Sequence, residues 1–168
     1  TIVVLSEGMK RTLVERKGVA SDRVQVVPLW ARPELDPTLS DDSQRRDLDV
    51  NDGELLVLYA GNMGIMHPLE WVLDAAVSCE GLPVRFLLMG DGARRESLQD
   101  RVEEEDIPRV SFLPYQLESR FAGIMAASDV SLVVLQPGLE GFAVPSKAYT
   151  SMSAGKPLIA LMEPHADI

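Results

Sequence analysis

Cysteine is nearly absent from this sequence, because Cys79 is the only one among 168 residues. A single cysteine can form neither an intramolecular disulfide nor a cluster of thiolate metal ligands. The spacing of His, Asp and Glu residues suggests no other metal site, so no metal is predicted. The low cysteine content indicates a reduced, cytoplasmic setting.

Basic residues are outnumbered, with 16 Lys and Arg against 26 Asp and Glu, and the formal net charge is −10. Proteins that bind nucleic acid nonspecifically need a basic face to displace counterions from phosphates, so this function is excluded. An anionic small molecule remains a suitable ligand, because a local group of amides and one lysine can outweigh a distant acidic surface.

Long hydrophobic runs are also missing. The longest, such as Val130 to Leu135, are far too short to cross a bilayer. No signal peptide opens the sequence, and the abrupt strand-like start at Thr1 suggests a fragment of a longer protein. With 46% hydrophobic residues, the chain can bury one core, so we predict that residues 1–168 form a single domain.

Apolar runs and amphipathic stretches alternate along the chain. The apolar runs predict strands at residues 2–5, 24–28, 55–60, 84–89, 110–113, 130–135 and 157–161. Helices are predicted at residues 6–17, 69–79, 94–106, 117–127 and 145–154, with Ser6 as the cap of the first. Residues 31–53 are polar and proline-containing, which predicts a surface loop.

Strands that are apolar throughout, separated by helices of ten or more residues, are typical of a parallel sheet covered on both faces. We therefore predict an α/β fold with a Rossmann-like parallel sheet. Ligands of such sheets bind at the carboxyl ends of the strands. The loops that start at Gly61, Gly90, Pro114 and Gln136 should meet there.

Two glycine-containing loops follow predicted strands. Gly61 to Gly64 could turn tightly and bring backbone amides near a phosphate, with a helix start beyond. An ordinary strand-to-helix turn explains the same residues equally well. Gly90 to Gly92 lacks the third glycine of the dinucleotide-binding fingerprint and is better explained as a tight turn.

A third loop, Leu139 to Val144, leads into Pro145, Ser146 and Lys147. Pro145 suits the first position of a helix, where its missing N–H costs nothing. The free amides of Ser146 and Lys147, together with the Lys147 ammonium, would then form an anion site. The alternative is a solvated surface lysine.

The order of these segments resembles the C-terminal domain of GT-B glycosyltransferases of the retaining family 4. The matching pieces are Val4–Met9, Val26–Pro28, Tyr59–Gly64, Phe86–Gly92, Val110–Tyr115, Ala127–Val130, Glu140–Phe142 and Ala154–Pro157. Each piece is weak alone, but the ordered set spans nearly the whole chain. Among subfamilies, it is most similar to enzymes that build bacterial surface polysaccharides.

The resemblance implies a site for a nucleotide-diphosphate sugar. Its diphosphate would lie against Gly61, Asn62, Met63, Gly64, Val144, Pro145, Ser146 and Lys147, beyond the loop of Gly141, Phe142 and Ala143. Glu140 would bond the sugar hydroxyls, so Glu140 and Lys147 are the candidate catalytic residues. The base would rest against Leu113, Pro114, Tyr115 and Gln116, bordered by Gly90, Asp91 and Gly92.

Two features depart from the family pattern. Asn62 and the pair His67 and Pro68 stand where the family often has an arginine and a lysine, so Lys147 is the main candidate cation. The ribose-binding glutamate of the family is missing. Counting back from Gly155 places Thr150 there, and counting forward from Glu140 reaches Ala148.

We therefore expect the donor half of a retaining, hexosyl-type glycosyltransferase, with no cofactor and a UDP- or GDP-linked sugar as donor. An N-terminal domain would bind the acceptor, so the fragment alone is expected to be inactive. Peripheral association of the full-length enzyme with the inner face of the membrane is compatible with this interpretation. Two alternatives stay open: a non-catalytic nucleotide-binding module, and a related enzyme such as a nucleotide-sugar epimerase.

Overall fold

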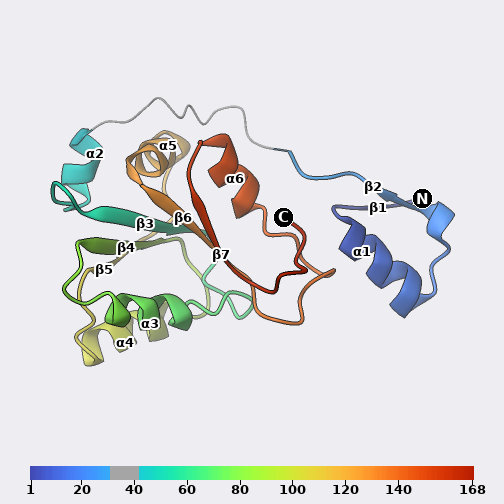
Figure 1. Cartoon of the computed structure of the whole chain (residues 1–168), viewed down its shortest axis with the longest axis horizontal. Coiled ribbons are helices and arrows are strands. Elements are labelled where there is room, and N and C mark those ends of the chain that lie inside the picture. The colour runs from blue at the N-terminus through green and yellow to red at the C-terminus, as the bar shows by residue number, and fades with distance from the viewer. Residues whose placement is uncertain (31–41) are drawn as a thin grey trace.

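A computed structural model describes residues 1–30 and 42–168 (Figure 1). Its largest element is a parallel sheet of five strands. The strands are β3 (Leu55–Ala60), β4 (Val84–Met89), β5 (Val110–Leu113), β6 (Val130–Val134) and β7 (Leu158–Leu161). They lie in the order β5-β4-β3-β6-β7, so the chain builds outward in one direction from β3 and then returns to its other side. The direction reverses between β3 and β6, which makes this the topological switch point of a doubly wound sheet.

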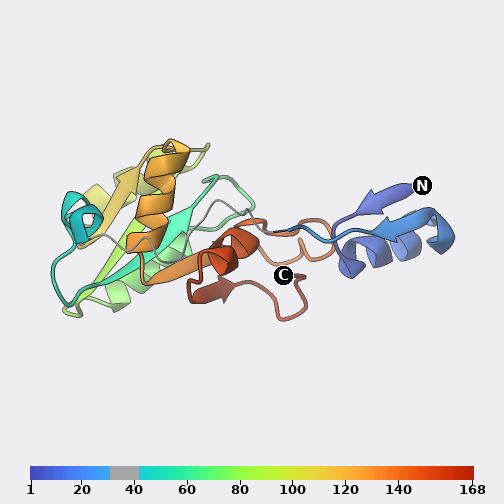
Figure 2. The same ribbon diagram turned by 90° about the horizontal axis from the view of Figure 1, so that it is seen from above.

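Helices cover both faces of this sheet (Figures 1 and 2). On one face lie α3 (Glu70–Ser78) and α4 (Arg95–Glu104). On the other lie α2 (Asp42–Asp47), α5 (Glu118–Ala127) and α6 (Lys147–Ser153). This arrangement confirms the predicted Rossmann-like fold.

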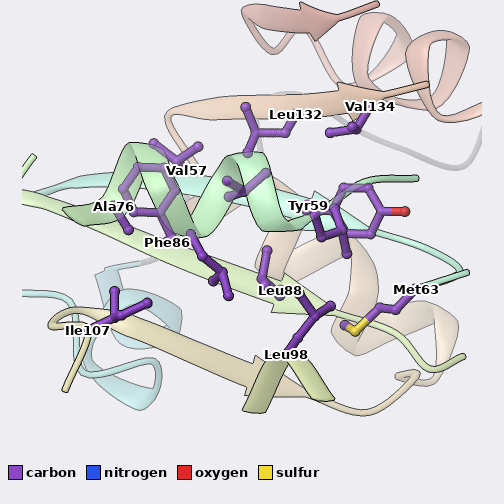
Figure 3. Packing of buried hydrophobic residues seen from close by; sticks show 13 residues of the cluster. Val57, Tyr59, Met63, Ala76, Phe86, Leu88, Leu98, Ile107, Leu132 and Val134 are labelled. Atoms are coloured by element: carbon purple, nitrogen blue, oxygen red, sulfur yellow. The ribbon is translucent and has the colours of Figure 1, made fainter. Parts of the chain in front are cut away.

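The burial of both sheet faces explains why the central strands are apolar throughout. Successive side chains of a strand point to opposite faces. Val57 and Tyr59 therefore enter the cluster under α3 and α4, which also holds Leu98 (Figure 3). Leu56 and Leu58 enter the second cluster, which is completed by buried residues of α5. Each cluster fixes the position of the helices on its face.

The first 30 residues form a smaller unit beside this body (Figure 1). Strands β1 (Ile2–Val4) and β2 (Val24–Val26) pair with each other in a two-stranded parallel sheet. Between them run α1 (Glu7–Arg11), a π-helical turn at Thr12–Arg16 and a 3-10 turn at Ser21–Arg23. As predicted, Ser6 caps α1, and its side chain accepts a hydrogen bond from the Met9 amide at 3.1 Å. The described chain thus contains two sheets, and the single domain for residues 1–168 stays a prediction.

The structure differs from the predicted surface loop at residues 31–53. Residues 31–41 of that stretch lie outside the described residues, and α2 follows at Asp42–Asp47. Val50 is buried in the cluster under α5. Sequence reasoning missed this packing, because one short helix with a charged surface shows no apolar periodicity.

Arg45 explains why this short helix holds its place. Its guanidinium donates to the carbonyl oxygen of Ala127 at 2.8 Å and to the Asp129 carboxylate at 3.0 Å. Asp129 also accepts a hydrogen bond from the Leu56 amide at 2.7 Å. One carboxylate therefore connects α2, the start of β3 and the turn before β6.

We expect Arg45→Met to lower the free energy of unfolding by about 1–3 kcal/mol, because the half-buried carboxylate of Asp129 loses its charged partner. Urea unfolding followed by circular dichroism measures the change. Arg46→Met is the matched control, since Arg46 lies in the same helix and is exposed. Equal losses in the two variants would contradict a specific role for Arg45.

Candidate functional site

A cavity of about 420 Å³ opens beside the carboxyl end of β3 and the neighbouring residues Ser131 and Leu132 of β6, at the switch point of the sheet. Its lining comes from five regions: the end of β3 and its loop, β6, the segment between β5 and α5, helix α5, and helix α6 with its N-cap. The residues are Leu58, Ala60, Gly61, Asn62, Tyr115, Phe121, Met125, Ser131, Leu132, Ser146, Lys147, Thr150 and Ser151. Residues of the loop that starts at Gly61 therefore line one hollow together with Ser146 and Lys147, which the resemblance assigned to the same diphosphate.

Lys147 crosses from α6 to the end of β3. It is the first residue of α6, and side chains of a helix lean toward its N-terminus, so the stem can reach out of the first turn. The stem passes directly over Gly61, where a Cβ atom would collide with Cε of Lys147. Gly61 also has a φ of +148°, which favours glycine. Glycine at position 61 thus lets the Lys147 stem pass close to the backbone at the end of β3.

The Lys147 ammonium lies in a half-buried position. Its Nζ is 3.3 Å from Nε2 of His67 and 5.1 Å from the centroid of the Tyr59 ring. Burial lowers the pKa of Lys147 from 10.5 to about 8. Burial, followed by the charge of Lys147, lowers the pKa of His67 below its usual value.

Lys147 is the only positively charged group among the described residues that line this cavity. The nearest basic residues of the β4–α4 connection are engaged elsewhere. Arg94 pairs with Glu70 at 3.0 Å, and Arg95 donates to the carbonyl oxygen of Gly90 at 2.7 Å. The cavity therefore offers an anion one cation, whose lowered pKa of about 8 lies close to neutral pH.

The two glycine loops pack against each other. The Gly61 amide donates to Met89 at 2.8 Å, and the Met63 amide donates to the carbonyl oxygen of Asp91 at 2.7 Å. A Cβ atom at Gly92 would lie 2.6 Å from the carbonyl oxygen of Met63. Asp91 itself is exposed, and its carboxylate accepts from the Gly92 amide at 2.8 Å. The loop at residues 90–92 supports the first loop and does not line the cavity.

The predicted helix starts at Leu69 and Pro145 lie one and two residues before the observed ones. Helix α3 begins at Glu70, after a turn that separates it from Gly64, so its first amides do not adjoin the glycine loop. Helix α6 begins at Lys147 with Ser146 as N-cap, and Pro145 lies one residue earlier. The carbonyl of Pro145 accepts from the Ala148 amide at 3.0 Å, which makes a tight turn of this segment rather than a first helical position.

A second cavity of about 570 Å³ adjoins the first and shares Phe121, Ser146 and Thr150 with it. Its other lining residues are Leu29, Trp30, Gln116, Glu118 and Tyr149. The predicted base-binding segment is therefore divided, with Tyr115 at the first cavity and Gln116 at the second. Leu113 and Pro114 support this segment through their carbonyl oxygens, which accept from the Gly90 amide and the Gln116 side chain.

Glu140 does not line the cavity of Lys147. It lies in a third hollow of about 190 Å³, whose lining includes Gly8, Arg11, Thr12, Glu15, Arg16, Gly141 and His165. The Glu140 carboxylate accepts a hydrogen bond from the Gly138 amide at 3.2 Å. The predicted catalytic pair Glu140 and Lys147 is thus distributed over two hollows.

The glycine after Glu140 allows this loop to approach α1. Gly141 has a φ of +74°, and a Cβ atom there would lie 2.9 Å from the carbonyl oxygen of Gly8. The Arg16 guanidinium lies over the ring of Phe142, 5.5 Å from its centroid. Ala143 and Val144 continue from this contact to α6 without lining a described hollow.

Several residues of these hollows were not predicted. They are Trp30, Phe121, Met125, Ser131 and Tyr149, together with Arg11, Thr12 and Arg16 of the N-terminal unit. Ser131 left a signal in the sequence, because it is a polar residue inside an otherwise apolar strand. The others could be found only from the strand order and the packing of α1 against the loop of Glu140.

Residues 1–30 and 42–168 contain neither a metal-binding cluster nor a membrane-spanning helix. Among them, no three His, Cys, Asp or Glu side chains gather in a way that could bind a metal ion. None of their helices combines the length and the apolar character that crossing a membrane requires.

A doubly wound parallel sheet with a cationic crevice at its switch point defines a class of α/β proteins that bind nucleotides or other phosphorylated ligands. Comparison with known proteins narrows this class. Residues 54–167 match the family model described as "Glycosyl transferases group 1". The chain belongs to this family.

Two curated relatives match nearly the whole chain. The probable glycosyltransferase WbjE of Pseudomonas aeruginosa is 31% identical over 170 residues, which is 99% of this chain and 42% of the relative. The putative colanic acid biosynthesis glycosyl transferase WcaI of Escherichia coli is 26% identical, with the same coverage. The chain thus spans less than half the length of either relative.

Solved structures agree on the fold. A glycosyltransferase from Rickettsia africae superposes with a TM-score of 0.78 at 17% identity, over 95% of this chain and 44% of that one. Anabaena HepE in complex with UDP-glucose gives a TM-score of 0.74 at 19% identity, over 94% of this chain and 43% of that one. The fold is that of the C-terminal half of GT-B glycosyltransferases, as the sequence resemblance predicted.

The burial of Lys147 predicts a stability that depends on pH. Its pKa falls from 10.5 in the unfolded chain to about 8 in the folded one, so the unfolded chain binds more protons between these values. The loss of folding stability caused by burying the charged amine is complete below pH 8 and declines as the pH rises. We expect Lys147→Met to raise the free energy of unfolding at pH 7 by about 1–3 kcal/mol, after loss of the contacts to His67 and Tyr59.

Urea unfolding at pH 7 and at pH 9.5 tests this expectation. The gain in Lys147→Met should be smaller at the higher pH, where the wild-type amine is largely neutral. Lys17→Met provides the control, since Lys17 is exposed. If Lys147→Met is less stable than the wild type at both pH values, burial of the charged amine does not lower the free energy of unfolding, and the expectation is wrong.

Proposed function

We propose that this chain is the donor-binding part of a glycosyltransferase that uses a UDP- or GDP-linked sugar, without a cofactor. The full-length enzyme transfers a hexose-type sugar to an acceptor with retention of configuration. Other parts of that enzyme bind most of the acceptor. The full-length enzyme associates peripherally with the inner face of the membrane.

The half-buried ammonium of Lys147 is the observation that carries this proposal. A charged group that burial disfavours is expected at a functional site, where a ligand of opposite charge repays its cost. Lys147 lies at the switch point of the sheet, where doubly wound proteins bind nucleotides. A diphosphate supplies the matching negative charge and fits a cavity of this size.

The relatives support the class of substrate. HepE, with the same fold, was solved with UDP-glucose and with UDP. WcaI is named for colanic acid biosynthesis, and the structurally similar WaaG for lipopolysaccharide biosynthesis. We extend both features to this chain, so the acceptor is a growing bacterial surface polysaccharide or its precursor.

In this proposal an acceptor hydroxyl oxygen forms a bond to the anomeric carbon while the bond from that carbon to the diphosphate oxygen breaks, and the acceptor's proton passes to the departing diphosphate. Negative charge grows on the departing diphosphate, and Lys147 stabilises that charge in a site partly shielded from water. Glu140 bonds the hydroxyls of the transferred sugar. Thr150, at the border of two cavities, gives the ribose a neutral hydrogen bond where the family has a carboxylate.

Replacing Lys147 tests the proposal directly. We expect Lys147→Ala to weaken binding of a nucleoside diphosphate by about 10- to 100-fold, the worth of one charge-assisted hydrogen bond. Isothermal titration with UDP and GDP measures the affinities, and circular dichroism checks the fold. Lys17→Ala is the control. Wild-type affinity in Lys147→Ala would show that the diphosphate does not bind at Lys147.

The affinity should also depend on pH. Only the protonated amine attracts the diphosphate. We therefore expect the affinity for a UDP-sugar to fall as the pH rises through about 8, which is the pKa of Lys147 in the folded protein without ligand. A nucleotide-sugar is the probe, because its diphosphate does not titrate near this pH. Lys147→Arg stays charged throughout and should abolish the fall; a fall that persists in Lys147→Arg would assign the titration to another group.

A further inference from the structure

His67 has no part in the proposed chemistry, although it contacts Lys147, which stabilises the departing diphosphate in that chemistry. The ring is half-buried between the loop after β3 and β6. Nδ1 lies 2.7 Å from the carbonyl oxygen of Val134, and Nε2 lies 3.3 Å from Nζ of Lys147. Both ring nitrogens are therefore engaged, one by the sheet and one by the cation.

These two contacts determine the tautomer of His67. A carbonyl oxygen only accepts hydrogen bonds, so Nδ1 must carry the proton that it donates to Val134. A lysine ammonium only donates, so Nε2 must present its lone pair. Both requirements are met by the neutral ring with its proton on Nδ1. Burial and the charge of Lys147 also lower the pKa of His67, which keeps the ring neutral.

A neutral acceptor suits the partner of a phosphate-binding lysine. An ammonium has three N–H donors, and a bond to His67 leaves two for a ligand. A carboxylate in this place would cancel the positive charge, whereas an imidazole leaves it intact. The lysine stem has several rotatable bonds, and holding it in advance lowers the entropy cost when the ligand binds.

The remaining sides of the ammonium are restricted as well. The Tyr59 ring lies 5.1 Å away, and Gly61 leaves the stem room. The Tyr59 hydroxyl donates to the carbonyl of Asn62 at 2.6 Å, which fixes that ring against the loop. Burial raises the pKa of Tyr59, so Tyr59 stays neutral. Of the described groups around the ammonium, His67 is thus the one with a free lone pair at hydrogen-bond distance.

We propose that His67 is a positioning residue: its ring, held by Val134, accepts a hydrogen bond from Lys147 and directs the ammonium toward the diphosphate of the donor. This inference rests on the proposed function, because it assumes that the cavity binds a diphosphate. It assigns to the histidine a role through Lys147 and no contact with the sugar.

Two variants separate the two ring nitrogens. Asn can place its amide nitrogen near the position of Nδ1, which keeps the donor to Val134 and removes the acceptor for Lys147. Gln can place its oxygen near the position of Nε2, which keeps the acceptor. We expect His67→Asn to weaken UDP binding by about 3- to 10-fold and His67→Gln to stay within about 2-fold of the wild type.

A double-mutant cycle with Lys147→Ala shows whether the effect passes through the lysine. Titration of UDP into the full chain should give His67→Asn, Lys147→Ala the same affinity as Lys147→Ala, within about 2-fold. An unchanged loss in the Lys147→Ala background would overturn the inference while leaving the proposed function intact. Failure of the wild type to bind UDP or GDP would overturn both.

The tautomer provides a test that needs no ligand and no change to the fold. Long-range ¹H–¹⁵N spectra at pH 7.5 distinguish a proton on Nδ1 from one on Nε2, and the signals missing from His67→Gln assign the ring. We expect the proton on Nδ1. A proton on Nε2 would leave Lys147 without an acceptor and would overturn the inference.

Discussion

The ammonium of Lys147 is half-buried, and burial disfavours its charged form. The residues around the switch point of the sheet accommodate this charge. The stem needs the space over Gly61, and the ammonium needs the lone pair of His67 and the ring face of Tyr59. In turn, His67 is held by a carbonyl of β6, and Tyr59 belongs to the core under α3. The position of one cation therefore depends on β3, β6 and α6 together.

The same need for close approach explains the glycines of the neighbouring loops. Gly92 lets residues 90–92 lie directly against the loop at residues 61–64, which donates two backbone hydrogen bonds to the carbonyl oxygens of Met89 and Asp91. A loop braced in this way loses little conformational entropy when a ligand binds. The glycines thus serve the rigidity of the site, in addition to any contact with a phosphate.

The N-terminal unit forms part of the separate hollow that holds Glu140. Gly141 touches the start of α1, and the Gly8 amide donates to the Asp167 carboxylate at 2.9 Å. Glu140 thereby faces Arg11 and Thr12 across a hollow that the five-stranded sheet alone does not form. A donor whose nucleotide lies near Lys147 and whose sugar extends to Glu140 would use both parts of the chain.

Local patterns in the sequence determined which segments form strands and helices. The predicted bounds of β3, β4 and β5 agree with the structure, because burial on both faces leaves an uninterrupted apolar run. The ordered motifs likewise determined the family. Helix α2 was missed because its place depends on Arg45 and its partners more than 80 residues away, which no local periodicity records.

Only the tertiary structure decided which of these residues meet. His67 and Lys147 are 80 positions apart, and their contact requires β6 to lie beside β3. Glu140 and Lys147 are close in sequence, yet the turn at Gly141 carries them to different hollows. The physical reason is that periodicity reports the burial of single segments, whereas a site arises where the packing of several segments brings their ends together.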